Sequence, residues 1–286
     1  MYINIRKAKG RMAKVYRKQN LHTHSSFCDG KNTIEETVIE AIERGFDSIG
    51  FSSHSYTPFD ESYCMKKDSI KAYSAECERV KQKYGDKIAV FCGMEQDFYS
   101  KKTSETLDFI IGAVHYVKVE NVYVPIDKSA DVIADAVGKY FENDIYAFVE
   151  KYYSNVENIK KATNCDVIAH FDLVTKFSER VDLIDENDPR YVKACEKALY
   201  KLVSDDVIFE LNSGAVARGW RSSFYPSIKI LNKIAELKGK ITFSSDCHDK
   251  TKLDLLFPEM RSAAICAGFD EFYVCTGKEF TSVSLR

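Results

Sequence analysis

The chain has 286 residues, 45% of them hydrophobic, and a formal net charge of −2. A chain of this size can bury a substantial core, as one α/β barrel domain or as two smaller domains. The charge gives no broad basic field, which argues against nucleic acid as the main partner. No apolar run approaches the roughly 18 residues that a membrane helix needs.

The nine cysteines include no Cys-x-x-Cys pair, and no secretory leader precedes them. We therefore expect free thiols in a cytoplasmic protein. Residues 1–18 hold seven basic residues and no acid. A nucleic-acid arm or a targeting peptide would share this charge, but the run is short and lacks Ser-rich bias. We interpret 1–18 as an extension without a role in the site and 19–286 as one catalytic domain.

The first predicted strand leads into His22 and His24. Side chains at i and i+2 of a strand point the same way, so these two imidazoles face one point. Asp29 follows at the mouth of the next loop. Imidazole and carboxylate together favour Zn, Mn or Fe over Ca or Mg. The alternative for His-x-His alone is a half-buried strand with two satisfied polar residues.

A helix and a second strand follow. Thr33 and Glu36 form a capping box ahead of an apolar stripe, and Gly45 ends the predicted helix. The apolar run 48–51 then leads to His54, which completes a βαβ unit.

Further short apolar runs end in polar residues at Glu95, His115, His170 and the i, i+2 pair Asp246 and His248. Such runs are typical of buried parallel strands. In barrel enzymes, polar residues at the C-terminal ends of these strands form the site. All six histidines lie in runs of this kind, so we predict a metal site at the barrel mouth.

The stretch from 116 to 169 is a longer excursion. It contains a predicted edge strand at 122–125 and a largely helical segment at 130–162, broken near 142–144. The segment 171–188 reads as a loop that can cover the site. The remaining predicted elements are helices at 189–203, 226–237 and 258–267 and strands at 207–212, 241–246 and 271–275. Seven strand–helix units and a terminal strand predict a single irregular barrel.

The ordered set of nine polar residues resembles the polymerase and histidinol phosphatase (PHP) superfamily, from about Asn20 to the C-terminus. The segments that resemble its histidinol-phosphatase branch are 93–98, 111–115, 125–127, 169–173 and 210–214. Asp29 also fits that branch, because other branches often carry His there. The resemblance implies a distorted (β/α)7 barrel with the metal site at the C-terminal ends of its strands.

Nine ligands with a bridging Glu95 are about right for three ions, since Zn-like ions take about four ligands each. The residues alone do not assign ligands to individual ions. The resemblance implies one ion on His22, His24, Glu95 and Asp246, a second on Glu95, His115 and His170, and a third on Asp29, His54 and His248. We therefore expect two to three Zn, Mn or Fe ions.

Such a cluster suits phosphoester hydrolysis, because metal ions make hydroxide available near neutral pH and clamp phosphoryl oxygens. The resemblance implies hydrolysis of L-histidinol phosphate, a small phosphomonoester, in histidine biosynthesis, with Glu95 and Asp246 in catalytic roles. A fixed cation is also needed for the equatorial oxygens. We predict Arg218 as this catalytic, substrate-binding cation and Arg221 as a second candidate. The alternative is a pair of solvated surface arginines.

Two other functions stay open. One is another PHP phosphoesterase, acting on nucleotides, oligonucleotides or phosphotyrosine. The other is a metal-stabilised, non-catalytic module like the PHP domains attached to bacterial DNA polymerases, although the complete ligand set weighs against it. Cys28 and Cys247 neighbour the ligands, but strand alternation turns Cys247 away from the site, and we assign neither a role.

Overall fold

The computed structural model describes residues 17–286; most of the predicted basic extension, residues 1–16, lies outside the described part. The backbone N–H groups of Arg17 and Lys18 both donate to Asp47 Oδ2 at 2.9 Å. Lys18 Nζ pairs with Asp254 at 2.8 Å. The two described residues of that extension therefore pack on the domain, and the boundary at residue 18 stays a prediction.

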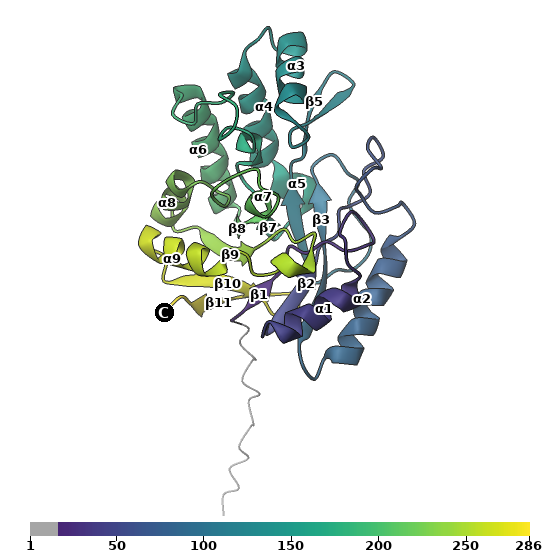
Figure 1. The fold of residues 1–286 in the computed structure, drawn as a ribbon. Helices are drawn as coiled ribbons and strands as arrows, with labels where there is room; N and C mark the ends of the chain where they lie inside the picture. The colour runs from purple at the N-terminus through teal and green to yellow at the C-terminus, as the bar shows by residue number, and fades with distance from the viewer. Residues whose placement is uncertain (1–16) are drawn as a thin grey trace, which may run out of the picture.

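Seven parallel strands form the central sheet in the order β1-β2-β3-β4-β7-β8-β9 (Figure 1). Their bounds are β1 Gln19–Asn20, β2 Ser48–Phe51, β3 Ala89–Asp97, β4 Phe109–Ala113, β7 Val167–Ile168, β8 Ile208–Asn212 and β9 Lys240–Ser244. Just beyond β1 and β9, His24 N donates to Cys247 O at 2.9 Å and Cys247 N donates to His22 O at 3.0 Å. These bonds bring the sheet edges together, and the predicted distorted seven-stranded barrel is confirmed.

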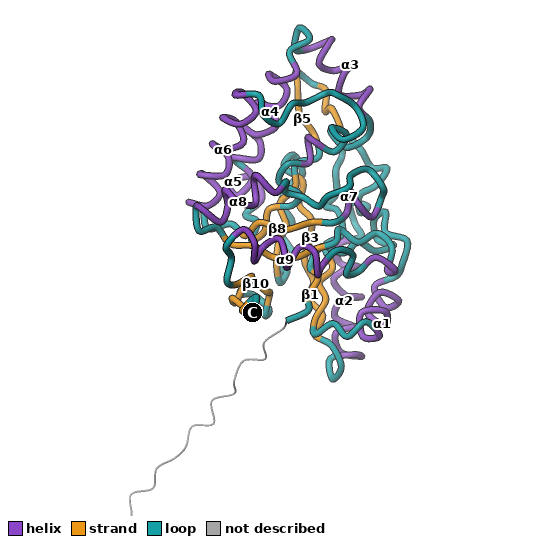
Figure 2. The backbone as a smooth tube through the Cα atoms, turned by 60° about the vertical axis from the view of Figure 1, so that its left-hand side comes forward, coloured by secondary structure: helices purple, strands orange, loops and turns teal. Residues whose placement is uncertain are grey.

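Helices lie outside the strands (Figure 2). They are α1 Ile34–Glu43, α2 Ile70–Tyr84, α5 Ile159–Thr163, α6 Pro189–Ser204, α7 Gly214–Ala217, α8 Ile228–Glu236 and α9 Phe257–Ala267. The capping box predicted for α1 is confirmed: Thr33 Oγ1 accepts from Glu36 N at 3.2 Å, and Glu36 Oε2 accepts from Thr33 N at 2.8 Å. None of the helices within 17–286 is long and apolar enough to cross a membrane.

Most of the excursion between β4 and β7 forms a lobe at the top of Figure 1 that packs against α6. It holds the antiparallel hairpin β5 (Tyr116–Val119) and β6 (Val122–Pro125), then α3 (Ala130–Tyr140) and α4 (Ile145–Glu157). The predicted helix break is confirmed, because Glu142 and Asn143 have positive φ and Asp144 caps α4 through Tyr146 N and Ala147 N. The lobe places the hairpin beside the barrel mouth.

The predicted last strand, β10 (Glu271–Cys275), pairs with a strand that the sequence did not reveal, β11 (Phe280–Ser284). This hairpin lies beside the start of β1. Gln19 Nε2 donates to Cys275 O at 2.8 Å, and Cys275 N donates to Gln19 Oε1 at 2.7 Å. The hairpin thus attaches to the N-terminal end of the barrel, away from the predicted metal ligands.

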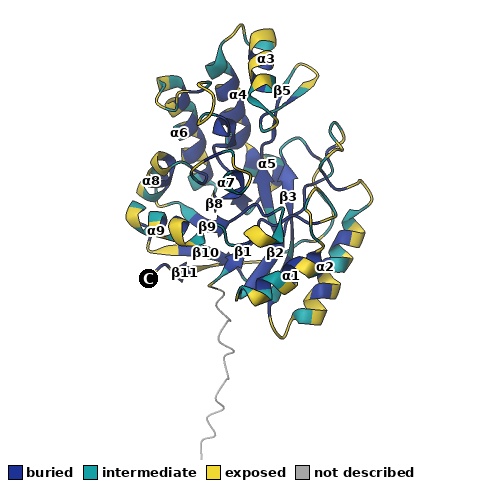
Figure 3. Ribbon diagram, in the orientation of Figure 1, coloured by how far each residue is buried: buried dark blue, intermediate teal, exposed yellow. Residues whose placement is uncertain are grey.

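Apolar side chains fill the barrel interior. The seven strands of the central sheet are mostly buried (Figure 3). The Phe109 ring approaches both Gly50 and Gly93 so closely that a Cβ at either position would lie under 3 Å from it. The glycines therefore make room for a packed apolar layer. Polar residues that follow it along the strands are consequently gathered at the C-terminal end.

Candidate active site

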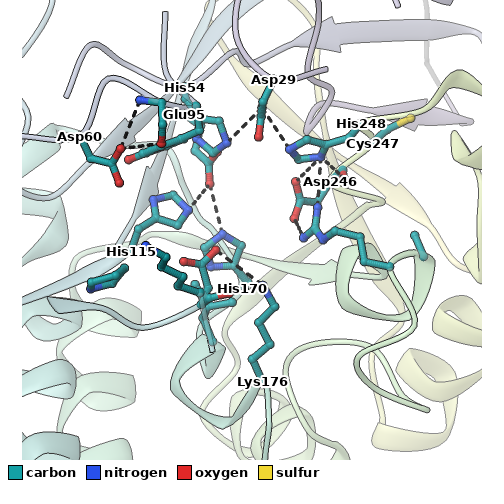
Figure 4. A pocket seen from close by; sticks show the side chains of 18 of the residues that line it. Asp29, His54, Asp60, Glu95, His115, His170, Lys176, Asp246, Cys247 and His248 are labelled. Carbon is teal, nitrogen blue, oxygen red and sulfur yellow. Dashed lines mark hydrogen bonds and ion pairs between the residues drawn. The ribbon is translucent and has the colours of Figure 1, made fainter. Parts of the chain in front are cut away.

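A cavity of about 560 Å³ opens at the C-terminal ends of the strands (Figure 4). Seven of the nine predicted ligands line it: Asp29, His54, Glu95, His115, His170, Asp246 and His248. The other two, His22 and His24, lie fully buried beside Glu95 and Asp246. The fold therefore brings all nine predicted ligands together.

Glu95, on β3, is the centre of the cluster. His54 Nδ1 lies 2.8 Å from one carboxylate oxygen, and His170 Nε2 lies 3.1 Å from the other. His115 Nε2 and His22 Nε2 are each 3.3 Å from Glu95. Burial raises the pKa of Glu95, but the imidazoles of His54, His22 and His115 outweigh it and hold that pKa well below its usual range. Glu95 is therefore an anion surrounded by imidazoles.

The pair that opens the site, His22 and His24, also faces Asp246. His24 Nε2 lies 3.1 Å and His22 Nε2 lies 3.6 Å from Asp246 Oδ1. Both Nε2 atoms are buried and make no hydrogen bond within the described residues. Leaving buried polar atoms unpaired is costly, and a divalent ion held by these two histidines would remove that cost. Burial, with His248 and His54 nearby, lowers the pKa of His24 to about 3, so its imidazole is neutral, as metal binding requires.

A third group forms around Asp29 on the loop after β1. Its Oδ1 lies 3.3 Å from His248 Nε2 and 3.7 Å from His54 Nε2. Three groups of residues each have ligand atoms that all lie within 4.8 Å of one another. The groups are His24–Asp29–His54–His248, His22–His24–Asp246 and His54–Glu95–His115. The donor chemistry fits divalent metal ions. Because His24 and His54 each occur in two groups, the assignment of ligands to single ions stays a prediction.

Two carboxylates contact predicted ligand histidines at the ring nitrogen that faces away from the cluster. Glu210 on β8 lies 2.9 Å from His22 Nδ1 and also accepts from Ser244 Oγ at 2.7 Å. Asp97 Oδ2 lies 3.3 Å from His115 Nδ1. Such partners fix the orientation of metal-binding imidazoles. The sequence analysis missed both roles, although a carboxylate within the apolar run 207–211 signals that a buried partner is required.

The two predicted arginines lie in different surroundings. Arg218 lines the cavity, and its guanidinium lies 2.6 Å from Asp246 Oδ2 and 3.1 Å from His248 Nδ1. The Arg221 side chain is 4% exposed and does not line the cavity, so the structure does not place it where it was expected to bind substrate. It donates instead to Thr175 Oγ1 at 2.5 Å. The alternative prediction, that both arginines are solvated at the surface, is also wrong for Arg221, because its side chain is buried.

Lys176 is the cation that sequence reasoning missed. It stands on the loop predicted to cover the site, lines the cavity and donates to Asp127 O at 2.8 Å. Burial lowers its pKa, and the positive charge of Arg218 lowers it further against the pull of Asp127. Lys176 and Arg218 therefore converge from two loops on one region of the cavity. No periodicity marks a loop residue, so the sequence carried no signal for it.

Comparisons with known proteins agree with this geometry. The family model described as PHP domain matches residues 20–214. The chain is 29% identical over 257 residues to a Schizosaccharomyces pombe protein named "Probable histidinol-phosphatase", covering 82% of this chain and 81% of that one. It is 23% identical over 256 residues to the histidinol-phosphatase of Bacillus subtilis, covering 81% and 93%.

A solved structure has the same fold. The crystal structure of histidinol phosphate phosphatase from Lactococcus lactis superposes with a TM-score of 0.71 at 21% identity, covering 92% of this chain and 98% of that one. The family match spans more than half of the chain and stops before Asp246 and His248, which the closing barrel returns to the site. On this match and this fold, the chain belongs to the PHP domain family.

Proposed function

We propose that this protein is a metal-dependent phosphatase that hydrolyses L-histidinol phosphate to L-histidinol and phosphate, a step of histidine biosynthesis. The observation that carries the proposal is the clustering of the nine predicted ligand side chains at a cavity that two loop-borne cations, Arg218 and Lys176, also line. The relatives named above are histidinol-phosphatases, and the Lactococcus lactis structure holds Zn, L-histidinol and phosphate.

The nine ligand residues would hold two to three divalent ions, Zn, Mn or Fe. When bound, such ions make hydroxide available near neutral pH and offset charge on phosphoryl oxygens. Around them, Glu210 and Asp97 keep the imidazoles of His22 and His115 in place. Glu95 and Asp246 supply the buried negative charge that retains cations, and Glu95 has imidazoles on both of its oxygens.

Arg218 and Lys176 would orient the phosphate. A guanidinium offers two parallel N–H groups to phosphoryl oxygens, whereas an ammonium acts as a point charge. Arg218 is held beside the metal ligands by its contact with Asp246, and Lys176 is held by the backbone of Asp127. Both cations stay in place before substrate arrives, which is what electrostatic stabilisation of a transition state requires.

The cavity lining holds an anion that suits a cationic alcohol. Asp60 lines the rim, and its carboxylate accepts from Tyr116 OH at 2.9 Å and from Ser62 Oγ at 2.6 Å. Burial raises its pKa, but the bonds from Ser62 and Tyr116 outweigh it, so Asp60 is anionic at neutral pH. An anion at this position suits the ammonium of histidinol.

Turnover of a substrate panel tests the proposal. We expect metal-reconstituted protein to release phosphate from L-histidinol phosphate with a kcat/KM about 10²-fold above that for phosphotyrosine or AMP, roughly the discrimination that a few polar contacts provide. Equal rates on all three would favour a broad phosphoesterase. A fully metal-loaded protein without turnover would favour the accessory module.

All nine cysteines are free thiols, which supports the cytoplasmic location that we also propose.

A further inference from the structure

Arg221 is a buried arginine that takes no part in the site described above, yet it contacts both loops that carry the cations. It stands three residues after Arg218 in the chain. Its guanidinium donates to Thr175 Oγ1 at 2.5 Å and to Thr175 O at 3.3 Å, and Thr175 immediately precedes Lys176. The same group lies 4.8 Å from the centre of the Tyr225 ring. One side chain therefore joins the two segments.

Other contacts join the same two segments. Asp172 Oδ2 accepts from Ser227 N at 2.9 Å, and Glu179 Oε2 accepts from Ser222 N at 2.6 Å. The rings of Phe177 and Trp220 meet edge to face at 5.2 Å. The loop 171–188 and the loop 213–227 are thus bound into one unit at the cavity wall, and Arg221 lies within it.

Within the described residues, Arg221 has carboxylates nearby but no close ion pair. Burial lowers the pKa of its guanidinium, but the charge of Asp172 and of other carboxylates outweighs burial and raises that pKa. Its side chain is 4% exposed, and its ion-pair partner, Glu179, lies 3.7 Å from Nε. That Nε is buried and makes no hydrogen bond within the described residues. A loosely paired buried charge of this kind can often be replaced by a well-packed apolar side chain at little cost in stability. The feature that an apolar residue lacks is a donor for Thr175: one guanidinium nitrogen, Nη1, bonds both the Thr175 hydroxyl and its carbonyl oxygen.

We infer that Arg221 is a positioning residue that fixes Lys176 relative to Arg218, so that both cations reach one phosphoryl group. The inference rests on the proposed function in that both cations bind phosphate. Among the described residues, the hydrogen bonds and the ion pair of Arg221 go to residues other than the predicted ligands, and Arg221 does not line the cavity. It acts through Thr175 on one loop and through its own backbone on the other.

The test uses full-length, metal-loaded protein and inorganic phosphate as the probe. We expect Arg221→Met to weaken phosphate binding, measured by calorimetry, by about tenfold, and to raise KM for the phosphomonoester in parallel. Metal content should not change. Arg221→Lys keeps the charge and a single nitrogen donor for Thr175, so it should recover part of the lost phosphate binding. Unchanged binding in Arg221→Met, or no recovery in Arg221→Lys, would overturn the inference.

Arg190 provides a matched control. It is a surface arginine that joins α4 to α6 through Asp144 at 2.7 Å and Glu150 at 2.9 Å, far from the cavity. Arg190→Met should lower the melting temperature and leave phosphate binding and KM at wild-type values. If Arg221→Met shows this same pattern, its role is only structural and the inference is wrong.

A double mutant isolates the route of the effect. In a Lys176→Met background the cation that Arg221 positions is absent, so adding Arg221→Met should weaken phosphate binding by less than twofold more. Fully additive losses would contradict the inference. If Arg221→Met does not fold, Thr175→Val removes the same hydrogen bond and should raise KM in the same direction. The protein could bind phosphate through both cations and yet not hydrolyse L-histidinol phosphate. That result would reject the proposed function but leave the inference about Arg221 intact.

Discussion

The two sides of the cavity are built differently. One side, called the metal side here, consists of the nine predicted ligands, which lie on or shortly after parallel strands. Backbone pairing such as that between His54 and Glu95 sets the spacing of these ligands. On the other side, Lys176 and Arg218 stand on loops, and side-chain contacts between those loops hold them. The first side is fixed by the barrel and the second by tertiary packing. Substitutions on the metal side should therefore abolish activity, whereas those on the loop side should reduce it by degrees.

The largest effect is expected from Glu95→Gln. The change preserves size but removes a charge that imidazoles contact at both oxygens, so at least one ion should be lost and turnover should fall by about 10³-fold or more. Elemental analysis and kcat measure both effects, and circular dichroism should show an intact fold. Glu279→Gln, on the exposed β10–β11 hairpin, is the matched control. Near-normal turnover of Glu95→Gln would remove this residue from the centre of the site.

Metal removal tests the same side without mutation. Purified protein should contain two to three equivalents of Zn, Mn or Fe, and chelation should abolish phosphatase activity until metal is restored. Full activity in metal-free protein would end the proposed mechanism and with it the distinction between the two sides.

On the loop side, Arg218→Ala should lower kcat/KM by about 10²-fold, in line with the loss of one preorganised donor. Inhibition by free phosphate should weaken in parallel. Because Arg218 contacts Asp246 and His248, metal content must be measured in the same samples. A loss of metal equal to the loss of activity would mean that Arg218 belongs to the metal side.

Lys176→Met should cost about tenfold in kcat/KM, less than the arginine, because an ammonium lacks the bidentate fork. Burial and Arg218 lower the pKa of Lys176, so this cation is lost as pH rises through a value below that of an ordinary lysine, about 10.4. The kcat/KM of the wild-type protein should therefore fall as pH rises through this value, which gives the profile an alkaline limb. Lys176→Arg should move the limb to higher pH, and an unmoved limb would assign it to another group.

The smallest effect is expected away from both sides. Thr33→Ala removes the cap of α1, where Thr33 Oγ1 accepts from Glu36 N, and should cost about 1 kcal/mol of unfolding free energy. Turnover per folded molecule should not change, because α1 contributes no residue to the cavity. Chemical denaturation and kcat on the same samples check this, and a fall in kcat would show that the helix layer supports the site directly.

The sequence by itself determined the barrel and which nine polar residues, the predicted ligands, cluster at its mouth. Apolar runs that end in His, Asp or Glu mark strand ends, and the two-residue period of a strand aims His22 with His24 and Asp246 with His248. Helix boundaries followed from local chemistry, such as the capping box at Thr33. These features depend on neighbours in the chain, which is why a single sequence carries them.

Only the tertiary structure decided what the loops do. Arg221 meets Thr175 across 46 positions, and His22 meets Glu210 across 188. Neither pairing leaves a periodic pattern, so Arg221 was expected to bind substrate and Lys176 was passed over. The same holds for β11 and for the Cys247 bridge that closes the barrel. A buried charge takes its role from the partners that packing brings to it, and those partners are set by the whole fold.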